Sequence, residues 1–275
     1  MSRHSFNNTA LVTGGASGIG FELCKLLAKD GHDLVLVDMN EVGMIRAADE
    51  LRTEYGVKVK IVYKDLSDPN AAKEIYEKLE ALDIKINTLV NNAGFGLTGR
   101  FTDLELDEQL QMMQVNMNAV VSLTSYFLPE LLKQRQASIL NLASIAAFQA
   151  GPYMATYFAS KAFVLSFSEA LASELEGTSV SVTSVCPGPT DTGFASRAGA
   201  HGSIAFKPTS MMHVVDVAKE AYSAMKANRT VIIPGVTNKL AILASRFVPR
   251  TTVTAVAGLM NKRTNQVTQV IDAAV

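Results

Sequence analysis

Short apolar runs alternate with longer segments of mixed apolar and polar residues along most of the chain. Short, continuous apolar runs are typical of strands that are buried on both faces, whereas the mixed segments have helical periodicity. The predicted strands lie near residues 9–13, 33–37, 58–63, 87–90, 137–143, 179–185 and 229–233. The predicted helices lie near residues 18–30, 41–55, 69–82, 105–133, 153–176 and 214–227, with Pro69 and Pro129 marking helix edges.

This alternation predicts an α/β fold in which seven parallel strands form a doubly wound, Rossmann-like sheet. No linker or internal repeat divides the chain. We therefore expect a single domain, with its main body over residues 1–235 and a C-terminal helical extension over residues 236–275. Right-handed crossovers place the turns that follow the strands at one edge of the sheet, so functional residues are expected there.

Composition excludes several function classes. The 275 residues, of which 48% are hydrophobic, suffice for one sizeable core, and the net charge of −1 gives no reason to expect nucleic-acid binding. No apolar run reaches the length of about 18 residues that a membrane span needs, and the N-terminus lacks a signal-peptide core. The cysteines Cys24 and Cys186 fit packing in a reducing, cytoplasmic compartment. The four histidines have no metal-ligand spacing, so no metal site is expected.

A glycine-rich turn, Thr13-Gly14-Gly15-Ala16-Ser17-Gly18-Ile19-Gly20, joins the first predicted strand to the first predicted helix. Gly14 permits a tight turn, Gly18 lets the backbone approach a pyrophosphate, and Gly20 lets the helix pack against the strand. The unpaired amides at the helix N-terminus suit an anion. Strand, glycines and helix in this order predict a dinucleotide site.

The second predicted strand ends in an acidic residue, Asp38, which follows Gly20 by 18 residues. A carboxylate at this position can accept hydrogen bonds from the adenosine ribose and would repel a 2′-phosphate. Ala16, Ser17, Met39 and Asn40 offer no positive charge, so NAD is predicted and NADP is less favoured. Alternatively, Asp38 is the N-cap of the helix that begins near Glu41.

Tyr157 and Lys161 are four residues apart. Ser144, at the end of an apolar run, precedes Tyr157 by 13 residues. Tyr222 and Lys226 repeat the spacing without an upstream serine and are predicted to lie on an ordinary surface helix. On one helix, residues four apart share a face, so the Lys161 ammonium can lie near the Tyr157 phenol. Together with the glycine turn, this arrangement predicts a hydride-transfer site.

The residue types suit the proton transfer that accompanies hydride transfer between a carbinol carbon and a nicotinamide ring. Tyr157 is the candidate acid/base. Because the pKa of a free tyrosine is about 10, we expect Lys161 and the positive nicotinamide to favour its phenolate. Lys161 can also bind the nicotinamide ribose, and Ser144 can hydrogen-bond the substrate oxygen.

With these motifs in order, the chain resembles the compact, single-domain short-chain dehydrogenase/reductase family from about Asn8 to Gly235. Further matches are Asp65-Leu66, Asn91-Asn92-Ala93-Gly94, Asn116 and Pro187-Gly188-Pro189-Thr190-Asp191-Thr192. The resemblance implies an NAD(P)-dependent oxidoreductase acting on CH–OH groups. It also implies a homodimer or homotetramer formed through the helices near 105–133 and 153–176.

The resemblance assigns roles to further residues. Asn116 would position a water that connects Lys161 to solvent, although by itself it reads as a helix residue with a solvated amide. Asp65 and Leu66 would contact the adenine, and residues 91–94 would line the cofactor. Thr190 and Thr192 would hold the carboxamide; at position 190 many members have an aliphatic residue, but the contact is through the backbone. The predicted catalytic residues are Asn116, Ser144, Tyr157 and Lys161. The predicted cofactor-binding residues are Gly14, Ser17, Gly18, Ile19, Gly20, Asp38, Asp65, Leu66, Asn92, Ala93, Gly94, Tyr157, Lys161, Pro187, Gly188, Thr190 and Thr192.

Two segments bear on the substrate. The family resemblance implies that the segment from Gly193 to His213 forms a mobile lid over the substrate, and its apolar residues suggest a lipophilic substrate. They are Phe194, Ile204, Phe206, Met211 and Met212, with Phe95, Phe148, Tyr153 and Met154 as further candidates for the pocket wall. Equally, such residues can belong to the core.

The C-terminal extension is basic, with no acidic residue between Glu220 and Asp272. Three interpretations are open: a cationic, amphipathic helix pair in peripheral contact with an anionic membrane or a partner, a tail packed over the substrate pocket, and a solvated helix pair docked on the body or another subunit.

The sequence thus predicts an oxidoreductase that interconverts a secondary alcohol and a ketone with NAD(H). One alternative is an NAD-binding regulator or scaffold without turnover. Another is an NAD-dependent epimerase or dehydratase, although those relatives usually have a different glycine spacing and a longer substrate domain.

Overall fold

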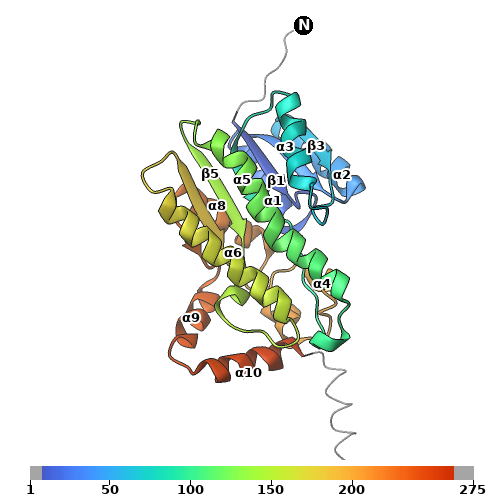
Figure 1. Ribbon diagram of the computed structural model, residues 1–275, viewed down its shortest axis with the longest axis vertical. Coiled ribbons are helices and arrows are strands. Elements are labelled where there is room, and N and C mark those ends of the chain that lie inside the picture. The colour runs from blue at the N-terminus through green and yellow to red at the C-terminus, as the bar shows by residue number, and fades with distance from the viewer. Residues whose placement is uncertain (1–7, 263–275) are drawn as a thin grey trace, which may run out of the picture.

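The computed structural model describes residues 8–262. Within them, seven parallel strands form one sheet in the order β3-β2-β1-β4-β5-β6-β7 (Figure 1). The predicted doubly wound sheet is confirmed. The strands are β1 (Thr9–Thr13), β2 (Asp33–Asp38), β3 (Val59–Tyr63), β4 (Ile86–Asn91), β5 (Ala137–Leu142), β6 (Val180–Val185) and β7 (Val231–Ile232).

Helices cover both faces of the sheet because successive strand residues point to opposite sides. In β1, Ala10 and Val12 pack in the core beneath α1 (Gly18–Lys29), α2 (Glu41–Tyr55) and α8 (Val214–Lys226), whereas Leu11 belongs to the core on the other face. That second core lies beneath α3 (Ala71–Ala81), α5 (Ala119–Leu131) and α6 (Ala155–Glu174). Both faces are apolar, which explains why the strands read as continuous apolar runs.

The long helix predicted near residues 105–133 is interrupted by one wide turn. It consists of α4 (Leu106–Met113), a π-helical turn (Gln114–Asn118) and α5. Pro129 lies inside the last turn of α5 and not at its edge, so that prediction was wrong. Near the end of a helix, a proline removes only one backbone hydrogen bond before the helix stops.

Shorter elements gather at the carboxyl edge of the sheet. The predicted lid contains α7 (Phe194–Arg197) and two 3₁₀ turns, Ile204–Phe206 and Pro208–Ser210; others are Phe101–Asp103 and Ile145–Phe148. Beyond β7, α9 (Val236–Ser245) and α10 (Arg250–Asn261) form the end of the molecule opposite the N-terminus (Figure 1). No helix within residues 8–262 is long and apolar enough to cross a membrane.

Candidate active site

A cavity of about 880 Å³ opens at the carboxyl edge of the sheet. It is lined by the turns that follow the first six strands, by the lid, and by α9 and α10. The structure brings together here every predicted site residue except Gly20 and Asn116. The predicted residues that line it are Gly14, Ser17, Gly18, Ile19, Asp38, Asp65, Leu66, Asn92, Ala93, Gly94, Ser144, Tyr157, Lys161, Pro187, Gly188, Thr190 and Thr192.

The glycine turn has the backbone that its sequence predicts. Gly14 and Gly18 have φ angles of +66° and +58°, which side-chain-bearing residues rarely adopt. A Cβ on Gly20 would lie 2.2 Å from the carbonyl oxygen of Gly14 and 2.4 Å from Nδ2 of Asn92. Gly20 therefore contributes by packing beneath the turn, as its predicted role in helix packing requires, and it does not face the cavity.

Asn92 connects the turn after β4 to the glycine turn. Its Nδ2 donates to the carbonyl oxygens of Thr13 (2.9 Å) and Gly14 (3.1 Å), and its backbone N–H donates to Oγ1 of Thr13 (3.0 Å). Asn91 instead points into the core, where its Nδ2 donates to Oδ1 of Asn141 (2.9 Å). Asn91 does not line the cavity, so the expectation that it does was wrong.

Asp38 faces the glycine turn from the end of β2. Its carboxylate accepts hydrogen bonds from the backbone N–H groups of Ala16 (3.2 Å) and Asn40 (3.0 Å). The N-cap of α2 is Asn40, whose Oδ1 accepts from the N–H of Gly43 (3.0 Å), so the alternative that made Asp38 the N-cap was wrong. The Asp38 carboxylate thus stays at the cavity wall, where an acceptor for ribose hydroxyls is required.

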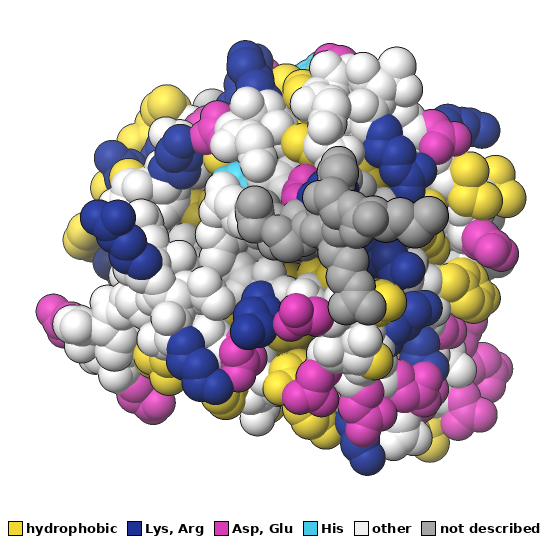
Figure 2. All heavy atoms as spheres, turned by 90° about the horizontal axis from the view of Figure 1, so that it is seen from above, with side chains coloured by type: hydrophobic (Ala, Val, Ile, Leu, Met, Phe, Trp, Pro, Cys, Tyr) yellow, Lys and Arg dark blue, Asp and Glu magenta, His cyan; other side chains and the backbone are white. Residues whose placement is uncertain are grey.

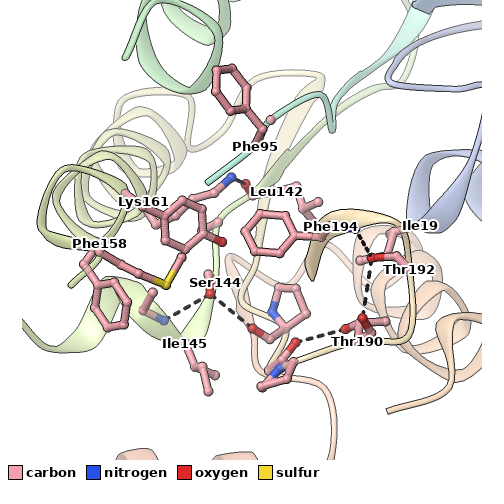
Figure 3. A pocket seen from close by; sticks show the side chains of 18 of the residues that line it. Ile19, Phe95, Leu142, Ser144, Ile145, Phe158, Lys161, Thr190, Thr192 and Phe194 are labelled. Atoms are coloured by element: carbon pink, nitrogen blue, oxygen red, sulfur yellow. Dashed lines mark hydrogen bonds between the residues drawn. The ribbon is translucent and has the colours of Figure 1, made fainter. Parts of the chain in front are cut away.

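Ser144, Tyr157 and Lys161 converge from two elements. Ser144 caps the 3₁₀ turn after β5: its Oγ accepts from the N–H of Ala146 (3.1 Å) and donates to the carbonyl oxygen of Pro187 (3.4 Å). Tyr157 and Lys161 lie one turn apart in α6, both buried. The side chains of Ser144 and Lys161 point into the same space (Figure 3).

Burial dominates the titration of this pair. It raises the pKa of Tyr157 to about 12, although the Ser144 hydroxyl acts in the opposite direction. Burial also lowers the pKa of Lys161 to about 8. The Lys161 ammonium lies 5.9 Å from the centre of the Tyr157 ring. The protein groups alone therefore keep Tyr157 protonated at neutral pH and suit it to donate a proton, whereas the predicted phenolate also requires the positive charge of a nicotinamide.

Asn116 is a buried residue of the π-helical turn, with 1% of its surface exposed, so the interpretation as a solvated amide was wrong. Its Nδ2 donates to the carbonyl oxygen of Phe95 (2.9 Å) and to Oγ of Ser160 (3.1 Å), and its Oδ1 accepts from the N–H of Phe95 (3.1 Å). A Cβ on Gly94 would lie 2.9 Å from Asn116 Oδ1 and 3.3 Å from Lys161 Nζ. Asn116 thus holds the turn after β4 beside Lys161.

The second Tyr-x-x-x-Lys pair has a structural role. In α8, the Tyr222 hydroxyl donates to Oδ2 of Asp30 (2.8 Å), and the Lys226 ammonium binds the same oxygen (2.5 Å). Both are outside the cavity. The prediction of an ordinary surface helix is confirmed.

The lid residue Phe194 packs its ring against that of Tyr157. The ring of Phe194 lies 5.3 Å from that of Tyr157 and 5.8 Å from that of Phe206. Of the nine predicted wall residues, four line the cavity: Phe95, Met154, Phe194 and Phe206. The other five do not, and that part of the prediction was wrong: Met212 and Phe148 pack against the core, and Ile204 is 41% exposed. These five are Phe148, Tyr153, Ile204, Met211 and Met212.

The structure adds lining residues that sequence reasoning missed. Gln111, Gln149 and Arg197 line the cavity, but no motif or spacing in the sequence marks them as site residues. The α9–α10 segment also forms one wall, through residues that include Val253, Ala257 and Met260. It is held by Asn261, whose Nδ2 donates to the carbonyl oxygen of Pro152 (3.1 Å). Of the three interpretations of the C-terminal extension, the tail over the pocket is confirmed within residues 8–262.

The site fits a dinucleotide better than a metal. No group of three or more His, Cys, Asp or Glu side chains within residues 8–262 could hold a metal ion. The glycine turn leaves its backbone uncovered toward the cavity, since a Cβ on Gly18 would meet only Thr192, at 3.4 Å. An uncovered backbone at a helix N-terminus is the cradle that a pyrophosphate requires.

Known proteins with similar sequences are short chain dehydrogenases, in agreement with the resemblance seen in the motifs. The family model described as short chain dehydrogenase matches residues 8–202. The 1-deoxy-11-beta-hydroxypentalenate dehydrogenase of Streptomyces avermitilis is 38% identical over 192 residues, which are 69% of this chain and 71% of that protein. A short chain dehydrogenase of Pseudocercospora fijiensis is 34% identical over 182 residues, 66% of this chain but only 59% of that protein's length.

Solved structures agree in fold over most of the chain. A short-chain dehydrogenase from Sphingobium yanoikuyae in complex with NADPH has a TM-score of 0.78 and 30% identity, covering 88% of this chain and 94% of its own. A short chain dehydrogenase/reductase from Burkholderia phymatum in complex with NAD has a TM-score of 0.75 and 28% identity, and the match covers 88% of this chain and 92% of that protein. The bulky-bulky ketone specific alcohol dehydrogenase from Comamonas testosteroni has a TM-score of 0.74 and 27% identity, and the match covers 88% of this chain and 93% of that protein.

Proposed function

Because the chain belongs to the short-chain dehydrogenase family, whose members are NAD(P)-dependent oxidoreductases acting on CH–OH groups, we propose that it interconverts a secondary alcohol and a ketone with NAD(H). The observation that carries the proposal is the convergence of Ser144, Tyr157 and Lys161 in one cavity with the glycine turn and Asp38. Acid/base, positioning and nucleotide-binding groups are all present in it.

In this mechanism, Tyr157 exchanges a proton with the substrate oxygen while Ser144 holds that oxygen by a hydrogen bond. A bound nicotinamide supplies or accepts the hydride. Lys161 binds the nicotinamide ribose, and its positive charge opposes the protonation of Tyr157 when an alcohol is oxidised. Asn116 positions the turn beside Lys161 and, by family resemblance, a water that connects it to solvent.

The cofactor would lie along the turns after the strands. The glycine turn would bind its pyrophosphate, Asp38 its adenosine ribose, and Asp65 with Leu66 its adenine. Residues 92–94 would line its middle, and residues 187–192 its carboxamide end. The preference for NAD rests on the Asp38 carboxylate, which would repel a 2′-phosphate; similar proteins have been solved with either NADPH or NAD.

We propose a lipophilic substrate. Support comes from the apolar part of the cavity wall, to which the lid contributes Phe194 and Phe206, and α10 contributes Val253 and Met260. A similar enzyme is named for specificity toward bulky ketones, and another for a hydroxypentalenate substrate. Both names fit a large pocket with an apolar wall.

The decisive experiment is a fluorescence titration of the purified protein with NADH and with NADPH, because it requires no knowledge of the substrate. Tighter binding of NADH supports the proposal and sets the cofactor for a screen of lipophilic alcohols and ketones. Tighter binding of NADPH overturns the role of Asp38. Binding of neither favours a scaffold without turnover, and product formation without net oxidation favours an epimerase or dehydratase.

We also propose that subunits associate as a homodimer or homotetramer in the cytoplasm. Exposed apolar side chains on α4 to α6 support association, among them Leu106, Leu110 and Phe163. Cys24 and Cys186 are buried and unpaired, and burial raises the pKa of both thiols, which fits a reducing compartment. Elution as a monomer at micromolar concentration would contradict the assembly.

A further inference from the structure

The helices α9 and α10 expose apolar side chains that no described part of the chain covers. Val236, Leu240, Leu243 and Phe247 are 69%, 60%, 52% and 84% exposed. They are spaced by four, three and four residues, which places them along one side of α9 and the turn after it; we call these four residues the apolar stripe. In α10, Val256 and Leu259 are also more than half exposed.

The same segment carries an uncompensated positive charge. Residues 236–262, here called the α9–α10 arm, contain Lys239, Arg246, Arg250 and Lys262 and no acidic residue. Lys239 pairs with Glu220 at 3.5 Å. Within residues 8–262, no carboxylate lies within ion-pairing distance of the other three cations.

The charge is local to this end of the molecule. The protein as a whole has a net charge of −1, so the rest of the chain is more acidic than the arm. Figure 2 views the end away from α10, and on that face acidic and basic side chains are interspersed. An exposed apolar helix face flanked by cations is typical of helices that lie in the interface of a bilayer.

We propose that the α9–α10 arm docks on an anionic lipid bilayer, with the apolar stripe in the acyl boundary and Arg246, Arg250 and Lys262 against the headgroups. Anionic headgroups supply the negative charge that the arm lacks. A second copy of the chain fits less well, because a twofold contact would bring the same cations of both copies together without a carboxylate between them.

The docking surface adjoins the cavity. Val248, Val256 and Met260 line the cavity and are also 39%, 54% and 37% exposed, so its rim and the arm share side chains. A lipophilic substrate dissolved in the bilayer would reach the cavity beside this rim. This last step rests on the proposed function, whereas docking itself requires neither substrate nor cofactor.

Co-sedimentation of the full chain with vesicles tests the docking. At low salt we expect it to sediment with vesicles that mix phosphatidylserine with phosphatidylcholine, and not with phosphatidylcholine alone. The L240E/F247E variant should bind at least about 10-fold more weakly. The control V42E/I45E adds the same two negative charges at exposed apolar positions of α2, and it should bind like the wild type.

A second pair of variants tests the charge. R246Q/R250Q should bind about 25-fold more weakly, since each basic residue near an anionic surface contributes about fivefold. R46Q/R135Q, which removes two exposed arginines elsewhere, should change binding little. NADH titration of every variant verifies the fold, and loss of NADH binding by the wild type would overturn the proposed function without affecting the vesicle result.

Three outcomes would overturn the docking proposal. They are no sedimentation of the wild type, equal sedimentation with both kinds of vesicle, and equal weakening by the arm variants and their controls. If light scattering shows that L240E/F247E dissociates an oligomer while vesicle binding is unchanged, the apolar stripe belongs to a contact between copies of this chain.

Discussion

The ammonium group of Lys161 donates a hydrogen bond of 2.7 Å to the carbonyl oxygen of Leu142, the last residue of β5. This bond fixes Lys161 between the strand that leads to Ser144 and the helix that carries Tyr157. An ammonium has three donors, and Leu142 is its only acceptor among residues 8–262. The other two donors are the ones that a ribose with two hydroxyl groups would satisfy.

Replacement of Lys161 by methionine is expected to stabilise the protein without nucleotide. Burial lowers the native pKa of Lys161 to about 8, below the value of about 10.5 for an exposed lysine, so the native state releases this proton first. The free energy of unfolding of the wild type therefore rises as the pH increases from 8 to about 10.5. Below pH 8, burial of the charged ammonium lowers this free energy by its full amount, up to about 3 kcal/mol. Urea unfolding at pH 7 should show K161M to be more stable by about 1–3 kcal/mol.

This gain should shrink as the pH approaches 10, because the wild type then loses its charge as well. A variant that is less stable than the wild type at pH 7 would show that the bond to Leu142 outweighs the cost of burial. Turnover and NADH affinity should both fall in K161M, whatever its stability.

Replacement of Tyr157 by phenylalanine removes the proton donor but keeps the ring that packs against Phe194 and Phe158. We expect kcat to fall by about 10²- to 10⁴-fold, while NADH binding stays nearly unchanged. Steady-state kinetics and fluorescence titration measure the two effects. Tyr222→Phe is the matched control, and turnover should survive it because Tyr222 lies outside the cavity, where its hydroxyl donates to Asp30.

Replacement of Asp38 by asparagine is expected to shift cofactor preference toward NADPH. The change removes the charge that would repel a 2′-phosphate and keeps one of the two oxygens that accept from the Ala16 and Asn40 amides. The ratio of the NADH and NADPH dissociation constants should change at least about 10-fold, equivalent to about 1.4 kcal/mol. An unchanged ratio would mean that Asp38 does not face the adenosine ribose.

Replacement of Gly20 by alanine tests the packing of the glycine turn. The new Cβ would meet the Gly14 carbonyl oxygen and the Asn92 amide, so we expect a loss of at least about 2 kcal/mol of unfolding free energy and weaker NADH binding. Gly193→Ala is the control: φ at Gly193 is −65°, and nothing lies within 4 Å of its added Cβ. It should alter stability by less than about 1 kcal/mol.

Tertiary structure decided which members of each motif face the cavity. Asn91 and Asn92 are neighbours of identical type, yet only Asn92 bonds to the glycine turn, because successive residues at the end of a strand point in different directions. Likewise, Asn116 reads as a polar helix residue until the π-helical turn buries it against Phe95. The sign of the Tyr157 pKa shift depends on burial, which no local spacing reveals.

The sequence by itself determined the order of the strands and helices, the glycine turn and the serine, tyrosine and lysine of the candidate site. These follow from local periodicity, from backbone geometry that only glycine adopts readily, and from spacing along one helix. The tertiary structure alone decided that α9 and α10 close one wall of the cavity and that no described part of the chain covers the apolar stripe. Which face of a helix is covered depends on long-range packing, and the amphipathic pattern of the arm is equally compatible with body, partner and bilayer.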